Sequence, residues 1–258
     1  MRVLLLLAWF VAPVAALAAE RGPTPVSFAA SDNVTVFADY YRAGTPGRPL
    51  ILLFHQAGSN RAEYTTIAPI LATLGFDALA IDQRSGGSLW GRANETVQHL
   101  GHSEGYDAAF HDLEGALLWA KSSGPARPVI VWGSSYSAAL VFLLAAKYQQ
   151  DVKALLAFSP GEYLARATAV RSAAAQLSIP MFATSAKESG EVAQAKAILD
   201  AAPARQKVQF VPRVAGVHGS STLRSDRNPK GVDENWDAVK AFLAPLALSS
   251  ISPAMNHS

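Results

Sequence analysis

The stretch VIVWGSSYSA at residues 129–138 decides the fold. Its apolar first half has the length and composition of a buried strand, and the mostly apolar residues 136–148 have the length of a buried helix. Gly133, Ser134 and Ser135 stand where the strand would turn into the helix. A serine at such a junction lies on a tight turn, with its hydroxyl close to the N–H groups that open the helix.

Short apolar runs alternate with longer helical patterns along the rest of the chain. We expect two antiparallel strands and then six buried parallel strands, at residues 25–28, 35–41, 49–55, 76–82, 128–132, 152–158, 179–184 and 207–211. Helices are expected between the buried strands and after the last, at residues 62–74, 106–121, 136–148, 190–201 and 232–244. This alternation predicts an α/β fold, a mainly parallel sheet of about eight strands with helices on both faces. The short connection between residues 158 and 179 leaves no room for a large cap domain.

The composition excludes several kinds of protein. Of the 258 residues, 50% are hydrophobic, 16% are charged and none is cysteine, and the net charge is +2. A chain of this length can bury one large core without cross-links. The missing cysteines exclude a disulfide scaffold and a thiolate nucleophile. The nearly balanced charge argues against a nucleic-acid partner, which would require a basic surface.

The first residues are typical of an export signal. Met1 and Arg2 precede an apolar run that ends in small residues, and we expect cleavage after Ala18 or Ala19. An uncleaved anchor is the alternative, but a membrane span needs about 20 apolar residues, and this run contains Pro13. The prediction is an exported bacterial protein, periplasmic or secreted, with no stable membrane insertion. Leader, folded domain and flexible tail are expected at residues 1–19, 20–248 and 249–258.

The junction resembles the nucleophile turn of the α/β-hydrolase family, more closely its small dienelactone-hydrolase-like and esterase members. The family pattern Gly-x-Ser-x-Gly stands here as Gly133-Ser134-Ser135-Tyr136-Ser137. Ser137 departs from the pattern but is small enough for the turn. A second register with Ser137 as nucleophile is open, but Ser135 is preferred because it places Gly133 at the end of the strand.

The resemblance implies an acid and then a histidine farther along the chain. His218 follows the last expected strand in a loop that contains glycines, which matches the family's catalytic histidine. The acid is expected after the strand at residues 179–184, where two glutamates compete. We expect Glu188 to orient the imidazole. Glu191 is the alternative, and its other possible role is a favourable contact with the helix dipole.

The resemblance also implies the backbone amides that bind the oxyanion. We expect them from Tyr136, the residue after the nucleophile, and from Gln56, in the loop after the strand at residues 49–55. His55 is expected to be a buried scaffold residue. Trp90 is predicted to contact the substrate at the rim of the site, and packing at the domain edge is the alternative.

Two further groups of polar residues have weaker patterns. Asp82 and Arg84 follow a predicted strand and resemble structural residues that tie family loops together through charge-assisted hydrogen bonds. A metal site is the alternative use of a second group, His99, His102 and His111 with Glu104, Asp107 and Asp112. Glycines interrupt the helical spacing that such a site would need, so we predict no metal and no other cofactor.

Two functions from different classes fit these residues. The first is a serine hydrolase that cleaves a small-molecule ester or related acyl bond through an acyl-enzyme, with Ser135, His218 and Glu188 as its triad. The second is a non-catalytic hydrolase-fold protein that binds a ligand or partner in the same place. A serine in place of the last glycine and the absence of an acid aspartate are features that the second would show.

Overall fold

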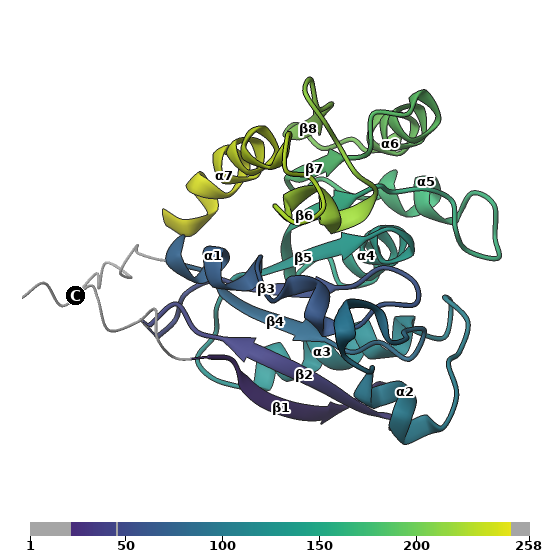
Figure 1. Ribbon diagram of the computed structural model, residues 1–258. Coiled ribbons are helices and arrows are strands. Elements are labelled where there is room, and N and C mark those ends of the chain that lie inside the picture. Colours follow the sequence, from purple (N-terminus) through teal and green to yellow (C-terminus); the bar gives the residue numbers. More distant parts are fainter. Residues whose placement is uncertain (1–21, 45, 249–258) are drawn as a thin grey trace, which may run out of the picture.

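The computed structural model describes residues 22–44 and 46–248, so the expected leader and the expected tail lie outside the described residues. One eight-stranded sheet has the order β1-β2-β4-β3-β5-β6-β7-β8 (Figure 1). The first two neighbouring pairs are antiparallel and the other five are parallel. The strands are β1 (Thr24–Ala29), β2 (Thr35–Tyr41), β3 (Leu50–Phe54), β4 (Asp77–Ile81), β5 (Val129–Ser134), β6 (Val152–Phe158), β7 (Met181–Thr184) and β8 (Lys207–Phe210). This confirms the predicted fold class.

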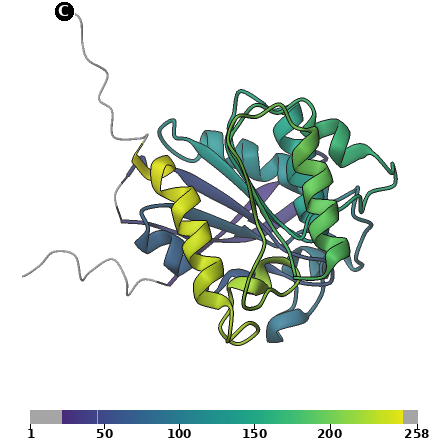
Figure 2. The same cartoon turned by 90° about the horizontal axis from the view of Figure 1, so that it is seen from above.

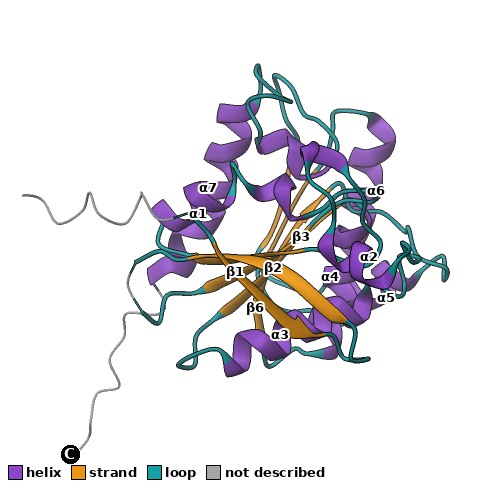
Figure 3. Ribbon diagram, turned by 60° about the horizontal axis from the view of Figure 1, so that its bottom comes forward, coloured by secondary structure: helices purple, strands orange, loops and turns teal. Residues whose placement is uncertain are grey.

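Helices cover both faces of the sheet (Figure 3). On one face lie α3 (Phe110–Ser122), α4 (Tyr136–Lys147), α5 (Ala169–Ala174) and α6 (Ser189–Ala201). On the other lie α1 (Ala68–Thr73) and α7 (Val232–Leu248). Seen from above, α7 and α6 lie on opposite sides of the strands (Figure 2). Each layer buries its apolar side chains against the sheet, which accounts for the continuous apolar runs of the central strands.

Several helical predictions differ from the structure, and the helix expected at residues 106–121 begins only at Phe110, as α3. The expected helix at 62–74 is divided into a short 3-10 helix, η2 (Arg61–Tyr64), and α1, which begins next to Pro69. Proline lacks an N–H group and therefore starts a helix more readily than it continues one. Helix α7 does not end before Pro245 but continues to Leu248, because Leu246 and Ala247 still pack against the core. Helix α2 (Glu95–Leu100) was not expected.

The parallel strands all point their carboxyl ends to one edge of the sheet. The connections that leave this edge therefore lie together, although they are far apart in the sequence. Between β6 and β7 the chain forms only the short helix α5 and no cap domain.

Candidate functional site

The turn between β5 and α4 holds Ser135 in a backbone conformation that L-residues rarely adopt. Its φ is 59° and its ψ is −124°. The Ser135 N–H donates to the Phe158 carbonyl at 2.8 Å, which holds the turn against β6. A Cβ atom on Gly133 would lie 2.3 Å from the Ser137 carbonyl oxygen, so only glycine fits at that position. The expected tight turn is therefore present, and it leaves the Ser135 hydroxyl partly exposed.

His218 lies next to the Ser135 hydroxyl. Its Nε2 atom is 2.8 Å from Ser135 Oγ. The 3-10 helix that follows, η4 (Gly219–Leu223), is held to the sheet because the Gly219 N–H donates to Ser159 Oγ and the Ser220 N–H donates to Ser134 Oγ. The imidazole is 41% exposed, so solvent and a small molecule can reach it. The structure thus brings together the predicted serine and histidine.

The carboxylate that contacts His218 is Glu191, and the expectation of Glu188 is wrong. Glu191 Oε1 lies 2.8 Å from His218 Nδ1, and its Oε2 accepts the Ala186 N–H at 3.2 Å. Glu188 precedes the first turn of α6, and its side chain is exposed and makes no capping bond. Glu191 lies three residues later, almost one helical turn on, and there the side chain faces the imidazole.

The contact between these two groups favours their charged forms. The hydrogen bond from His218 lowers the pKa of Glu191. The same bond raises the pKa of His218, and burial opposes this change. Glu191 therefore remains a carboxylate that can orient the ring and stabilise the imidazolium form.

The loop after β3 does not present the amide that the sequence suggested. The Gln56 N–H donates to Glu63 Oε2 at 3.0 Å, so it is not available to a ligand, and the expectation of Gln56 as a donor is wrong. The next amide, that of Ala57, has no acceptor among the described residues. Tyr136 is the first residue of α4, and its N–H has no acceptor within the helix. The available amides are therefore those of Ala57 and Tyr136. No motif in the sequence distinguishes Ala57 or Glu63.

Ser137 is not a rival nucleophile in this geometry. It is fully buried, donates to the His55 carbonyl at 2.6 Å and accepts from Gln83 Nε2 at 2.9 Å. His55 is itself buried, with Nε2 accepting the Gln83 N–H at 2.9 Å and Nδ1 placed 2.7 Å from the Gln56 carbonyl. Burial lowers the pKa of His55 to about 4. The prediction that His55 is a buried scaffold residue is confirmed.

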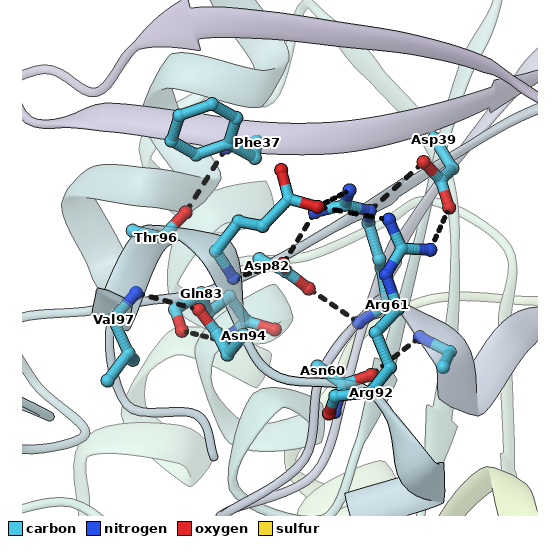
Figure 4. Close-up of polar contacts among 12 residues, drawn as sticks. Phe37, Asp39, Asn60, Arg61, Asp82, Gln83, Arg92, Asn94, Thr96 and Val97 are labelled. Atoms are coloured by element: carbon cyan, nitrogen blue, oxygen red, sulfur yellow. Dashed lines mark hydrogen bonds and ion pairs between the residues drawn. The ribbon is translucent and has the colours of Figure 1, made fainter. Parts of the chain in front are cut away.

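Asp82 and Arg84 are structural, as predicted, but they bind different partners. Asp82 accepts from Arg61, whose buried guanidinium also contacts Asp39 and Glu95 (Figure 4). Arg84 instead contacts Asp32 and Asp112. The Arg61 contacts connect β2, η2 and α2 with Asp82, just after β4, and the Arg84 contacts connect the turn between β1 and β2 with α3. Together they hold the loops that leave the carboxyl ends of the strands.

Two aromatic side chains follow β4 in the chain: Trp90, in the short 3-10 helix η3 (Leu89–Gly91), and Tyr106, in a turn before α3. Trp90 donates from Nε1 to Ser59 Oγ at 2.9 Å, and the guanidinium carbons of Arg224 and Arg227 lie 4.1 and 4.6 Å from its ring centroid. Its contact with a substrate stays a prediction. Tyr106, which the sequence did not single out as a site residue, stacks on Tyr136 with ring centroids 4.4 Å apart and is 39% exposed.

The candidate metal residues are dispersed. Asp112 and Glu104 contact Arg84, and His111 lies beside Ser31 and Glu114. Within residues 22–44 and 46–248, no group of three or more such side chains could hold a metal ion. No helix within the same residues has the length and apolar character needed to cross a bilayer.

A family model described as serine aminopeptidase, S33, matches residues 45–215, which include Ser135 and Glu191. The chain belongs to this family of α/β-hydrolases. No curated protein matches this chain at a significant level. The family match confirms the resemblance to α/β-hydrolases that the sequence predicts.

Solved structures similar to this S33-family chain include several hydrolases. An esterase from Pyrococcus furiosus is 18% identical, with a TM-score of 0.66 over 86% of this chain and 92% of that one. A dienelactone hydrolase from Anabaena variabilis is 15% identical, with a TM-score of 0.65 over 86% and 98%. A carboxyl esterase from Bacillus coagulans is 12% identical, with a TM-score of 0.66 over 88% and 100%. At these identities the likeness establishes the fold.

Proposed function

We propose that this protein is a serine hydrolase that cleaves a carboxylic ester of a small molecule. The observation that carries the proposal is the pair of 2.8 Å contacts on the two nitrogens of His218, one with Ser135 Oγ and one with Glu191 Oε1. A serine hydroxyl is a weak nucleophile until a base takes its proton, and the base must be held in the correct orientation. The arrangement supplies both requirements.

The reaction follows from these positions. His218 Nε2 takes the proton of the Ser135 hydroxyl while Oγ attacks the ester carbonyl. The Tyr136 and Ala57 amides stabilise the negative charge on the carbonyl oxygen. His218 then gives the proton to the departing alkoxide, which leaves as an alcohol. Water, deprotonated by His218, attacks the acyl group on Ser135, and His218 returns that proton to Ser135 Oγ as the Oγ–acyl bond breaks and the acid leaves.

The test is hydrolysis of p-nitrophenyl acetate by the wild-type protein, Ser135→Ala and Ser137→Ala. We expect activity in the wild type and in Ser137→Ala, and none above background in Ser135→Ala. A fluorophosphonate probe should label Ser135. Ester hydrolysis that survives in Ser135→Ala would disprove the proposal. An inactive wild type that the probe does not label would favour the non-catalytic alternative, in which the same residues bind a ligand.

The family description makes amide substrates the natural comparison. Esters and amides need the same nucleophile and oxyanion donors, but an amide also needs its leaving nitrogen protonated. An aminoacyl p-nitroanilide measured beside the ester would separate the two activities.

We propose that the protein is exported, because the first 19 residues have the composition of a cleaved leader. The N-terminal sequence of the protein recovered from a bacterial periplasm or medium should begin at Ala19 or Glu20. An intact N-terminus in the recovered protein would contradict this.

A further inference from the structure

A buried carboxyl group lies behind the loop that would bind the oxyanion. Glu63, in η2, is fully buried, and its Oε2 accepts the Gln56 N–H at 3.0 Å. Its Oε1 has no hydrogen-bond partner among the described residues. Burial of a carboxyl group without full compensation costs free energy. A role in the site would explain why this one is buried here.

The backbone of Glu63 is tied to the segments around the site. The Asn60 side chain accepts the Ala62 N–H at 2.9 Å and so begins η2. Arg224, just after η4, donates to the Glu63 carbonyl at 2.9 Å. The carboxyl group is therefore held at a fixed place between the loop after β3 and the segment that follows His218.

The Gln56 amide is the contact through which the Glu63 carboxyl can act on the loop. The charged and titratable groups near the Glu63 carboxyl group include Arg224, His218, Tyr64 and Tyr136. The Arg224 guanidinium does not compensate the carboxyl directly, since it donates to the backbone oxygens of Ala62 and Glu63 and to Asp226. Burial raises the pKa of Glu63, and the neighbouring Ser134 hydroxyl and the Gln56 amide oppose this.

We propose that Glu63 is a positioning residue: by accepting the Gln56 N–H, it fixes the His55–Gln56 peptide and so directs the following Ala57 N–H toward the oxyanion. An amide held by Glu63 cannot donate to a ligand, and the next amide along the loop is left to do so. The inference rests on the proposed serine hydrolase function. It assigns to Glu63 an effect on the transition state, without any contact with the substrate.

The experiment compares Glu63→Ala and Glu63→Gln with the wild type, using kcat and KM for p-nitrophenyl acetate below the melting temperature of each variant. Loss of one oxyanion donor costs about 10²- to 10³-fold in kcat in enzymes where it has been removed. For a displaced donor we expect Glu63→Ala to lower kcat by about 10- to 100-fold with KM changed by less than about threefold. Glutamine keeps an oxygen acceptor, so Glu63→Gln should retain kcat within about threefold of the wild type on the same reasoning.

Asp77→Ala is the matched control. Asp77 is also a buried carboxylate that accepts a backbone amide, from Ala43 at 2.8 Å, but it lies at the start of β4, at the opposite edge of the sheet. A purely structural role for Glu63 would lower the melting temperature of both alanine variants and leave kcat of the folded protein unchanged.

The outcomes separate this inference from the proposed function. Ester hydrolysis that persists in Ser135→Ala removes the proposed function whatever Glu63 does. If Ser135→Ala is inactive while Glu63→Ala keeps wild-type kcat, the positioning role is wrong. Equal losses in Glu63→Gln and Glu63→Ala also overturn it, because the oxygen acceptor is then not what matters. If Glu63→Ala does not fold, Glu63→Asp replaces it, since its shorter side chain withdraws the carboxyl from Gln56 and should lower kcat in the same way.

Discussion

Glu191 Oε1 lies 2.8 Å from Nδ1 of His218, although 27 residues separate the two in the sequence. The other ring nitrogen faces Ser135. A carboxylate on Nδ1 favours the tautomer whose Nε2 is free to accept a proton. In the proposed reaction, the position of this one carboxylate therefore controls whether the histidine can act as a base toward the serine.

Glu191→Gln should lower kcat/KM for an ester by about 10²- to 10⁴-fold, because loss of the carboxylate allows the wrong tautomer and removes the charge that stabilises imidazolium. Glu188→Gln is the control and should lie within about threefold of the wild type, because its side chain is exposed and does not contact the ring. Steady-state kinetics on both variants provide the measurement. A larger loss in Glu188→Gln would show that the acid is misassigned.

The pH dependence of kcat/KM should report the raised pKa of His218. The hydrogen bond from Glu191 is the main cause, and the negative charges of Glu63 and Glu188 add to it. Because only the neutral imidazole acts as a base, activity should rise with pH through a pKa above the ordinary value for histidine. In Glu191→Gln the residual activity should rise with pH at a lower pH than in the wild type. A rise at the same pH would show that another group controls the pH dependence.

His55 should make the protein less stable in mild acid. Its pKa is about 4 in the folded protein and 6.5 ordinarily, so between these values the unfolded chain binds a proton that the folded chain does not. Stability is therefore full above pH 6.5 and is lost as the pH falls toward 4, by up to about 3 kcal/mol. The free energy of unfolding, measured with urea from pH 4.5 to 7.5, should change less steeply with pH in His55→Gln than in the wild type. The His102 side chain is exposed, so His102→Gln should leave this pH dependence unchanged.

Gly133→Ala should destabilise the turn that carries Ser135. The added Cβ would meet backbone atoms of Ser137 and Ala138 at 2.3 to 2.6 Å, and backbone cannot move aside as a flexible side chain can. We expect a loss of about 1 to 3 kcal/mol in the free energy of unfolding and a loss of ester hydrolysis. Gly105→Ala, where no atom lies within 4 Å of the new Cβ, is the control. Equal stability of the two variants would mean that the turn can relax.

Arg61→Met should cost much more stability than removal of an exposed ion pair. Arg61 is 2% exposed and contacts Asp39 and Asp82, which are also buried. Without it the buried Asp82 loses its side-chain ion pair and Asp39 keeps only Arg92, and we expect a loss of about 3 to 5 kcal/mol. Lys196→Met removes an exposed pair with Asp200 and should cost less than about 1 kcal/mol. Chemical denaturation of both variants tests the difference.

Most of the sheet could be predicted from the sequence. The expected strands at residues 35–41 and 152–158 coincide with β2 and β6, and the others differ at their ends by one or two residues. Helix α2 was missed because its six residues, Glu95–Leu100, carry too few apolar positions for a clear period. Its Asn94 cap, which accepts the Val97 N–H, is visible in the sequence only once a helix is suspected.

The alternation of buried strands and helices, the strand-to-helix turn at Ser135 and a histidine loop near the end of the domain can all be inferred from the amino-acid sequence. These depend on local pattern, since burial of one face imposes a period on the chain. Which of two glutamates contacts His218, and which loop amide is bound by Glu63, become visible only in the folded arrangement. Both depend on which way a side chain or a backbone amide points at neighbouring positions. That direction is set by packing among segments far apart in the chain.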